Sequence, residues 1–210
     1  MRKTKAIKPR LGRPPSTDSA DTRRRILDVA RLAMAAKGYD AATNRNLGTE
    51  AGITAGAIYH YFGSKLDLYV AVHEDVAERV YSRLSAATRD VPTFRGRIEA
   101  VLETAHEMNN EDASLAQFLG AVRVDTRRNP ELRAALRGGQ VTRDAFFDSI
   151  VDVGLETGEI DPSHRDQVSA LVLTLLVGLT DAVSDDPSQH RLAIDAIKGL
   201  LEGKLIRPIP

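Results

Sequence analysis

Apolar residues recur at intervals of three and four from about residue 21 to residue 205, and no stretch alternates apolar with polar residues over the length of a strand. This period is that of an amphipathic helix that buries one face. Glycines, prolines and capping residues interrupt the pattern repeatedly, which indicates several separate helices. The sequence therefore predicts an all-α fold.

The first interruptions bound two short segments behind a longer one. A helix from about residue 21 carries its apolar face as far as Gly38, where a glycine stop is expected. Thr43 is a candidate N-cap for a short second helix, which Gly52 ends.

Thr54 is then a candidate cap for a third helix over residues 55–62, which Gly63 closes. Ser64, followed three residues later by Asp67, has the spacing of a capping box at the start of a long fourth helix. Two short helices joined by a tight turn behind a longer helix are typical of a helix-turn-helix unit, which presents the N-terminal turn of its last helix to the major groove of DNA.

The rest of the chain keeps the helical period. Beyond Pro92 we expect a fifth and a sixth helix, and then, after the break at Asn129-Pro130, one helix that carries Leu132 through Leu155. An apolar helix around residues 168–179 and a last helix around residues 194–205 complete the pattern.

The net charge of zero hides an uneven distribution of charge. Residues 1–65 contain 13 Lys and Arg against 5 Asp and Glu, which leaves 16 basic and 24 acidic residues for the remainder. A basic third followed by an acidic remainder indicates that the first part meets a polyanion, which we expect to be double-stranded DNA.

Several classes of protein are disfavoured. The chain has no cysteine, and its longest near-apolar stretch is too short to span a bilayer, so we expect a cytoplasmic protein without membrane contact. The histidines lack the spacing of metalloenzyme ligands, and the common nucleotide-binding and hydrolase motifs are absent. We expect neither a metal nor a cofactor, and no enzymatic activity.

Three segments resemble the DNA-binding signature of the TetR family of transcriptional regulators. They are GYDAAT at residues 38–43, AGITAGAIYHYF at residues 51–62, and Ser64-Lys65 with Leu68. The match spans roughly residues 22 to 70. It implies a homodimer through the last two long helices and a ligand pocket enclosed by the middle helices. The expected domains are a disordered basic arm over residues 1–18, a helix-turn-helix domain over 19–66, and a helical ligand-binding and dimerisation domain over 67–205.

Most of the candidate DNA contacts follow from this resemblance, and the arginines from charge and position. Gly12-Arg13-Pro14 is similar to the core of minor-groove hooks. The candidate DNA-binding residues are Arg13, Arg25, Thr43, Arg45, Thr54, Ala55, Gly56, Tyr59, His60, Tyr61 and Lys65. Two alternatives stay open, since Tyr59 can instead join the domain core and the Arg23-Arg24-Arg25 run can be a solvated helix face.

The second helix departs from the usual family pattern at Asn44, Asn46 and Gly48. A glycine inside a helix costs roughly 0.5 to 1 kcal/mol relative to alanine, so this helix is expected to be weakly held.

Pocket residues are less constrained by the pattern. The candidate ligand-binding residues are His106, Gln117, Phe118, Val122, Arg123, Phe146, Phe147 and Leu175. Core packing explains the apolar members of this set equally well. The hypothesis is a repressor that a small-molecule effector releases from a near-palindromic operator. The alternative is an architectural DNA-binding protein without a ligand.

Overall fold

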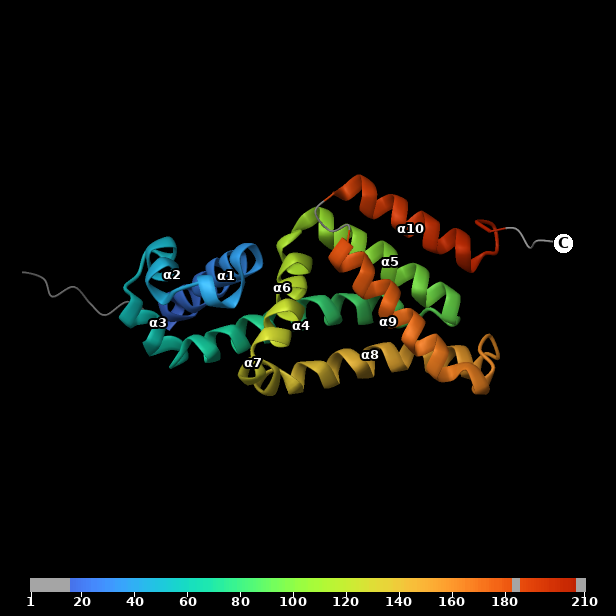
Figure 1. Ribbon diagram of the computed structural model, residues 1–210, viewed down its shortest axis with the longest axis horizontal. Coiled ribbons are helices and arrows are strands. Elements are labelled where there is room, and N and C mark those ends of the chain that lie inside the picture. Colours follow the sequence, from blue (N-terminus) through green and yellow to red (C-terminus); the bar gives the residue numbers. More distant parts are fainter. Residues whose placement is uncertain (1–15, 183–185, 207–210) are drawn as a thin grey trace, which may run out of the picture.

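The computed structural model describes residues 16–182 and 186–206, and every regular element within those ranges is helical. Helices α1 (Ser16–Ala41), α2 (Asn44–Ala51) and α3 (Ala55–Phe62) group at one end of the molecule (Figure 1). Helix α4 (Lys65–Thr88) runs from this head into the larger group formed by the remaining helices. The all-α expectation is confirmed.

Local capping explains where the short helices of the head begin. The side chain of Thr43 accepts a hydrogen bond from the backbone N–H of Asn46 at 3.3 Å. Thr54 does the same for the N–H of Ala57 at 3.1 Å. Each hydroxyl satisfies one of the N–H groups that a helix start leaves unpaired, so both predicted caps are confirmed.

The first helix differs from expectation at both ends. It begins at Ser16, inside the segment expected to be a disordered arm as far as Asp18. It is kinked at Gly38, whose φ of 74° is open to glycine, and helical residues continue to Ala41. Arg13, the expected minor-groove contact, lies outside the described residues.

Helix α4 connects two hydrophobic cores. Its start has the predicted capping box, in which Ser64 Oγ accepts from the Asp67 N–H at 3.0 Å. Leu68 and Val72 are buried in a core shared with the head. Leu84, further along the same helix, is buried in a second core made with the C-terminal helices. One rigid element therefore belongs to both parts of the molecule.

The larger group is built from the helices that follow α4. These are α5 (Phe94–Glu111), α6 (Ser114–Arg128), α7 (Pro130–Ala135), α8 (Arg137–Glu156), the 3₁₀ turn η1 (Pro162–His164), α9 (Arg165–Ala182) and α10 (Pro187–Leu201). No helix in the described part of the chain is both long and apolar enough to cross a lipid bilayer.

The single helix expected from Leu132 to Leu155 is wrong, because the chain breaks at Leu136. This residue leaves the helical conformation with ψ at 8° while its side chain stays buried. Immediately after the break, Gly139 passes so close to α4 that a Cβ there would overlap the imidazole of His73. The break thus lets α8 start in close contact with α4, a tertiary effect that periodicity does not carry.

Gly48 has a positive role in the turn between α2 and α3. The N–H of Ile53 donates to the Gly48 carbonyl at 2.8 Å, which folds the turn onto the helix. A Cβ at Gly48 would lie 2.9 Å from the carbonyl oxygen of Ile53 and 3.1 Å from the nitrogen of Ala55. The residue expected to weaken α2 is therefore the one that permits the tight turn.

Gly48→Ala should lower the free energy of unfolding. The clash costs about 1 to 3 kcal/mol, as overpacking does, and exceeds the gain in helix propensity of about 0.5 to 1 kcal/mol. Urea denaturation followed by circular dichroism measures the difference. Gly138→Ala is the control, since a Cβ at Gly138 meets nothing within 4 Å and should leave stability equal or higher. A Gly48→Ala protein as stable as the control would contradict the steric account.

Candidate nucleic-acid interface and adjoining cavity

One face of α3 is left open by the packing of the head. Ile58 and Phe62 are buried in the core, four residues apart on the inner side of the helix. Gly56, Tyr59 and His60 are exposed on the other side. This outer face contains no acidic residue and begins at a helix N-terminus, which favours contact with a phosphate backbone.

The two tyrosines of α3 have different surroundings. Tyr59 is 53% exposed, so the alternative that it joins the core does not describe this structure. Tyr61 is half-buried and packs against the head core, with its ring beside those of His60 and Phe62. Of the two hydroxyls, that of Tyr59 is therefore the better placed to reach a groove.

The threonine caps remain available to a second partner. Thr43 and Thr54 are both exposed, and each uses its oxygen as an acceptor for a helix N–H. A hydroxyl that accepts one bond still has a proton to donate, so each can also bind a phosphate oxygen. Ala55, at the first position of α3, is half-buried.

Lys65 supports the head as well as lying beside its surface. Its ammonium donates to the carbonyl oxygen of Asp40 at 3.1 Å and lies 4.3 Å from the ring centre of Tyr39. Burial lowers the pKa of this ammonium, although the charge of Asp40 opposes the change. The contact holds the start of α4 against the end of α1.

The arginine run at the start of α1 divides into three roles. Arg23 lies over the ring of Phe62 at 5.1 Å, and Arg24 forms an ion pair with Asp75 of α4 at 2.5 Å. Arg25 is exposed and bonds to no other described residue. The same holds for the guanidinium of Arg45 on α2. Arg25 and Arg45 thus keep their guanidinium groups for an outside anion.

Comparison with known proteins agrees with this geometry. Residues 26–72, which span the head and the start of α4, match the family described as bacterial regulatory proteins, tetR family. The regulator UidR of Escherichia coli K12, an HTH-type transcriptional regulator, is 27% identical over 191 residues, which cover 90% of this chain and 95% of UidR. The chain thus contains a DNA-binding domain of the TetR type at residues 26–72, and along most of its length it is similar to a transcriptional regulator. It is a DNA-binding regulator of transcription and not an enzyme.

Solved structures of TetR-like proteins share the whole fold. Salmonella enterica GusR superposes with a TM-score of 0.72 at 21% identity, over 90% of this chain and 98% of GusR. Bacillus subtilis FadR, solved in complex with stearoyl-CoA, superposes with a TM-score of 0.71 at 18% identity, over 89% of this chain and 99% of FadR. Both likenesses extend well beyond the head, into the helices that enclose the cavity described next.

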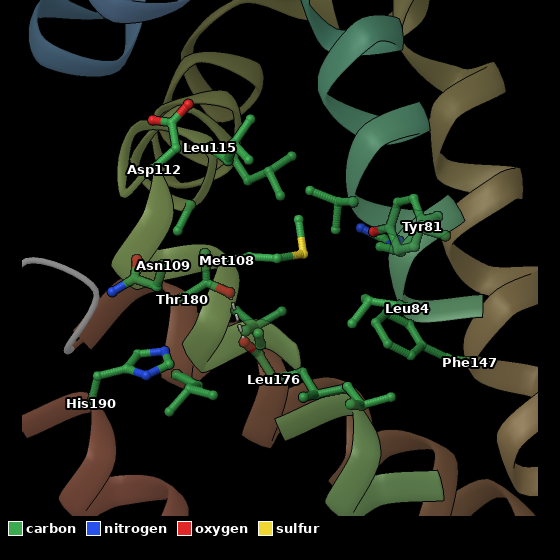
Figure 2. Close-up of a pocket in the computed structure, with 18 of the residues that line it drawn as sticks. Tyr81, Leu84, Met108, Asn109, Asp112, Leu115, Phe147, Leu176, Thr180 and His190 are labelled. Carbon is green, nitrogen blue, oxygen red and sulfur yellow. Dashed lines mark hydrogen bonds between the residues drawn. The ribbon is translucent and has the colours of Figure 1, made fainter. Parts of the chain in front are cut away.

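A cavity of about 120 Å³ lies among α4, α5, α6, α8, α9 and α10. Its wall is mostly apolar and includes Leu84, Met108, Leu115 and Leu176, which Figure 2 shows around the open space. Polar side chains occur at opposite ends. Tyr81 lies across the cavity from a group that includes Asp112 (Figure 2).

Of the expected ligand-binding residues, Arg123 and Phe147 line this cavity. Phe118 is instead fully buried against Tyr69, and Val122 packs against the same head-side core. The remaining expected residues have other neighbours. Phe146 is buried in the second core, Gln117 is half-buried on α6, and Leu175 lines a separate groove between α5, α9 and α10.

His106 is near the cavity without lining it. Its Nδ1 lies 3.0 Å from Nδ1 of His190, which does line the cavity, and the two rings stack at 5.3 Å. Burial, and then the neighbouring His106, lower the pKa of His190. The lining residues Tyr81, Asp112, Arg143 and His190 were not predicted, and no spacing in the sequence distinguishes them from ordinary helix positions.

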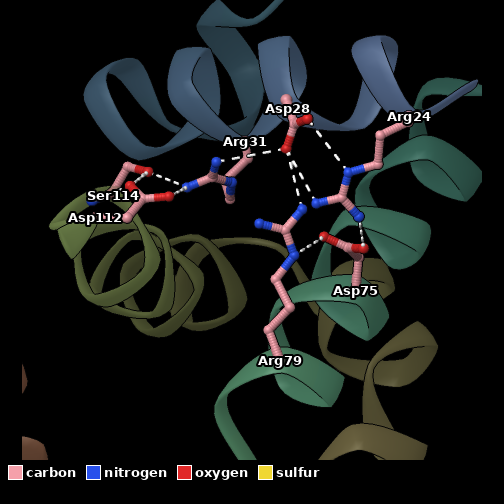
Figure 3. Close-up of polar contacts among 7 residues, drawn as sticks. All are labelled: Arg24, Asp28, Arg31, Asp75, Arg79, Asp112 and Ser114. Atoms are coloured by element: carbon pink, nitrogen blue, oxygen red, sulfur yellow. Dashed lines mark hydrogen bonds and ion pairs between the residues drawn. The ribbon is translucent and has the colours of Figure 1, made fainter. Parts of the chain in front are cut away.

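A buried arginine connects the head to the edge of this cavity. The side chain of Arg31 on α1 is only 7% exposed. Its Nη1 donates to Asp112 Oδ2 at 2.7 Å and to the hydroxyl of Ser114 (Figure 3). Asp112 and Ser114 form the junction of α5 and α6, so a charge from the DNA-binding head is neutralised by a residue of the cavity wall.

More exposed ion pairs surround this contact. Asp28 accepts from Arg24 at 3.3 Å and from Arg79 at 3.1 Å, while Asp75 also bonds Arg79 at 3.1 Å (Figure 3). These pairs tie α1 to α4. Because their side chains are partly exposed, each pair stabilises the contact between α1 and α4 by no more than about 1 kcal/mol.

Asn44, at the start of α2, has a buried side chain that is expected to lower the stability of the head. The residue is 8% exposed, and neither its Nδ2 nor its Oδ1 has a hydrogen-bond partner among the described residues. A buried amide without partners lowers stability, because its hydrogen bonds to water are lost on folding.

Asn44→Leu should therefore raise the free energy of unfolding by about 1 to 2 kcal/mol. Thermal and urea denaturation measure the change. Asn46→Leu on the same helix is the control, since Asn46 is exposed and its replacement should shift stability by less than about 0.5 kcal/mol. A loss of stability in Asn44→Leu alone would mean that the amide has a stabilising partner.

Proposed function

We propose that this regulator is a repressor that binds its operator as a homodimer and releases it when a small molecule enters the cavity. The observation that carries the proposal is the double role of Asp112. The residue lines the cavity and also holds Arg31, the buried cation of the DNA-binding head. A change at the cavity therefore alters a contact on which the position of the head depends.

Recognition of DNA is assigned to the outer face of α3 and its surroundings. Tyr59, His60 and the hydroxyl of Thr54 would meet the major groove, and the first turn of α3 offers its free N–H groups to phosphate. Thr43, Arg25 and Arg45 would bind the flanking backbone, with Lys65 fixing the start of α4 beside them. Phosphate contacts of this kind position the helix, and the groove contacts provide sequence preference.

Dimer formation is assigned to α9 and α10. Leu171 on α9 is 48% exposed, and Leu192 and Leu200 on α10 are 62% and 44% exposed. Large apolar residues gathered on two neighbouring helices favour burial against another surface. A second copy meeting the same face would place two heads on one side of the duplex, where successive major grooves lie about 34 to 36 Å apart.

Release by a ligand follows from differential binding. A ligand that fills the cavity better when the junction of α5 and α6 has moved shifts the protein towards that shape. Operator affinity then falls by the same factor by which DNA weakens ligand binding. The stearoyl-CoA complex of FadR supports an apolar guest within this fold. An architectural protein without a ligand has no use for such a cavity, so we favour the repressor.

The DNA-binding assignment predicts that Tyr59→Phe weakens operator binding by about tenfold or more, the contribution of one hydrogen bond to a charged group. The probe is a duplex of 30 base pairs enriched from a random library by the wild-type protein, and binding is followed by fluorescence anisotropy and by sedimentation. The wild-type complex should contain a dimer or a multiple of it.

Ser82→Ala is the control, since it removes an exposed hydroxyl from α4 away from the head and outside the cavity lining, and it should leave the affinity for the duplex unchanged. Equal affinity for the enriched and random duplexes would favour the architectural alternative. A single chain on the enriched duplex would exclude the dimer.

The coupling assignment predicts that Asp112→Asn separates the cavity from the head. Indole, a small fluorescent aromatic compound, serves as the cavity probe, and its Kd is measured with and without the enriched duplex. For the wild-type protein the duplex should weaken indole binding, by about 5-fold to 150-fold for a typical coupling. In Asp112→Asn this ratio should fall towards one.

Glu111→Gln is the control, because Glu111 is the adjacent acid but pairs with the exposed Arg83 of α4 rather than with α1. It should keep the wild-type ratio. A wild-type ratio of one would contradict ligand-controlled release, while an unchanged ratio in Asp112→Asn would place the connection elsewhere.

A further inference from the structure

Hydrogen-bond donors gather at one end of the cavity. Tyr81 of α4, Arg123 of α6 and Arg143 of α8 all line it. Three different helices thus bring two guanidinium groups and a phenol to one apolar space. Figure 2 shows Tyr81 at the end opposite Asn109, Asp112 and His190.

These donors are only partly used by the protein. Arg123 binds Asp181 through its Nε and Nη2. Arg143 binds Asp144 through the same two atoms, at 2.9 and 2.7 Å. Each arginine thus keeps its Nη1 group without a hydrogen-bond partner among the described residues, and so does the hydroxyl of Tyr81. A guanidinium has five N–H groups in a planar fork, so the remaining ones still favour an anion.

The local charges also favour an anion at this end of the cavity. Burial, followed by the charges of Arg127 and Arg143, lowers the pKa of Arg123. The arginines therefore repel one another in a partly desolvated place, and an anion between them would relieve that repulsion. Burial raises the pKa of Tyr81 to about 12, so its phenol stays protonated and can donate. The carboxylates of Asp144 and Asp181 are largely exposed and compensate the arginines only from the outer side.

Neither Asp144 nor Asp181 is part of the cavity wall. Among the described residues that line the cavity, Asp112 is the only carboxylate, it lies at the opposite end, and it is already paired with Arg31. The wall between the ends is apolar, with Leu84, Met108 and Phe147 among its members. A ligand that fits must therefore have an apolar body and a single anionic head.

We propose that the effector is a small organic acid whose carboxylate binds Nη1 of Arg123, Nη1 of Arg143 and the hydroxyl of Tyr81. Its body lies along the apolar wall. The cavity volume of about 120 Å³ is close to that of a cavity that accepts benzene, roughly 150 Å³, so the body is the size of one ring or a short chain. This inference rests on the proposed function, because it names the class of ligand for the same cavity.

Three probes that differ only in the head group test the proposal on the full-length protein. They are 3-phenylpropionate, 3-phenylpropanol and 3-phenylpropylamine, and isothermal titration calorimetry gives the Kd of each. The acid should bind about tenfold or more tightly than the alcohol, as expected for charge-assisted hydrogen bonds, and the amine should bind most weakly. Equal affinities, tightest binding of the amine, or no binding of any probe would overturn the proposal.

Substitutions then locate the head group. Arg143→Gln should remove most of the preference for the acid over the alcohol, and Arg143→Lys should keep a part of it, because lysine retains the charge and loses the fork. Tyr81→Phe should reduce the preference by a smaller factor. Arg165→Gln is the control, since Arg165 also pairs with acids, Asp148 and Asp152, and is not part of the cavity.

Each variant is first checked by circular dichroism and thermal unfolding. A preference for the acid that survives both Arg143→Gln and Tyr81→Phe would overturn the assignment of the head group to this end of the cavity.

Release of the enriched duplex is measured in parallel with the same probes. Binding of the acid without any loss of DNA affinity would leave the ligand class standing and contradict the proposed function. Release of DNA by the alcohol as readily as by the acid would leave the proposed function standing and contradict the assignment of an organic acid as the effector.

Discussion

The buried guanidinium of Arg31 is the contact on which the relation between the head and the rest of the chain depends. A charge with so little exposure is tolerated only where partners neutralise it, and here they are Asp28 on α1 itself and, at shorter distance, Asp112 at the junction of α5 and α6. Its Nε is buried without a partner, so the group is not fully satisfied even in this arrangement. Moving α1 away from Asp112 would leave this buried cation with only its longer contact to Asp28, at 3.5 Å, which restricts the position of the head relative to the cavity.

A second polar contact holds the same two helices together at the other end of α6. Oδ2 of Asp125 accepts from the backbone N–H of Tyr39 and from the hydroxyl of Tyr69, both at 2.9 Å. Asp125 and Ser114 are 11 positions apart on one helix, a separation of roughly 16 Å at the usual rise. Because α1 is fastened at both points, α6 and the head are expected to move together.

The sequence predicted the parts of this fold that depend on local chemistry. Thr43, Thr54 and Ser64 cap helices where they were expected to, because a cap requires only a side chain and an N–H two or three positions away. The break at Leu136 was missed, since it depends on how α8 meets α4. The steric role of Gly48 was not predicted for a similar reason, because helix propensity says nothing about a turn that folds back onto the helix.

The candidate site likewise has one part that the sequence predicts and one part that depends on tertiary packing. The outer face of α3 could be predicted from a familiar motif, although the exposures of Tyr59 and Tyr61 required the packed head. The cavity could not, because core residues and cavity-lining residues share one helical period. Phe118 and Phe147 are indistinguishable in the sequence, yet one fills a core and the other faces the open space.

The length of α4 gives the molecule a mechanical property. Lys65 at its head end and Tyr81 at the cavity are 16 residues apart, about 24 Å along a stiff helix. A tilt of about 5° around the cavity end would carry the head end through about 2 Å, as a lever arm converts a small rotation into a larger displacement. In the proposed dimer, each α3 must keep its register with the α3 of the second copy, so a change of a fraction of an ångström at the cavity would be enough to alter the spacing of the two heads.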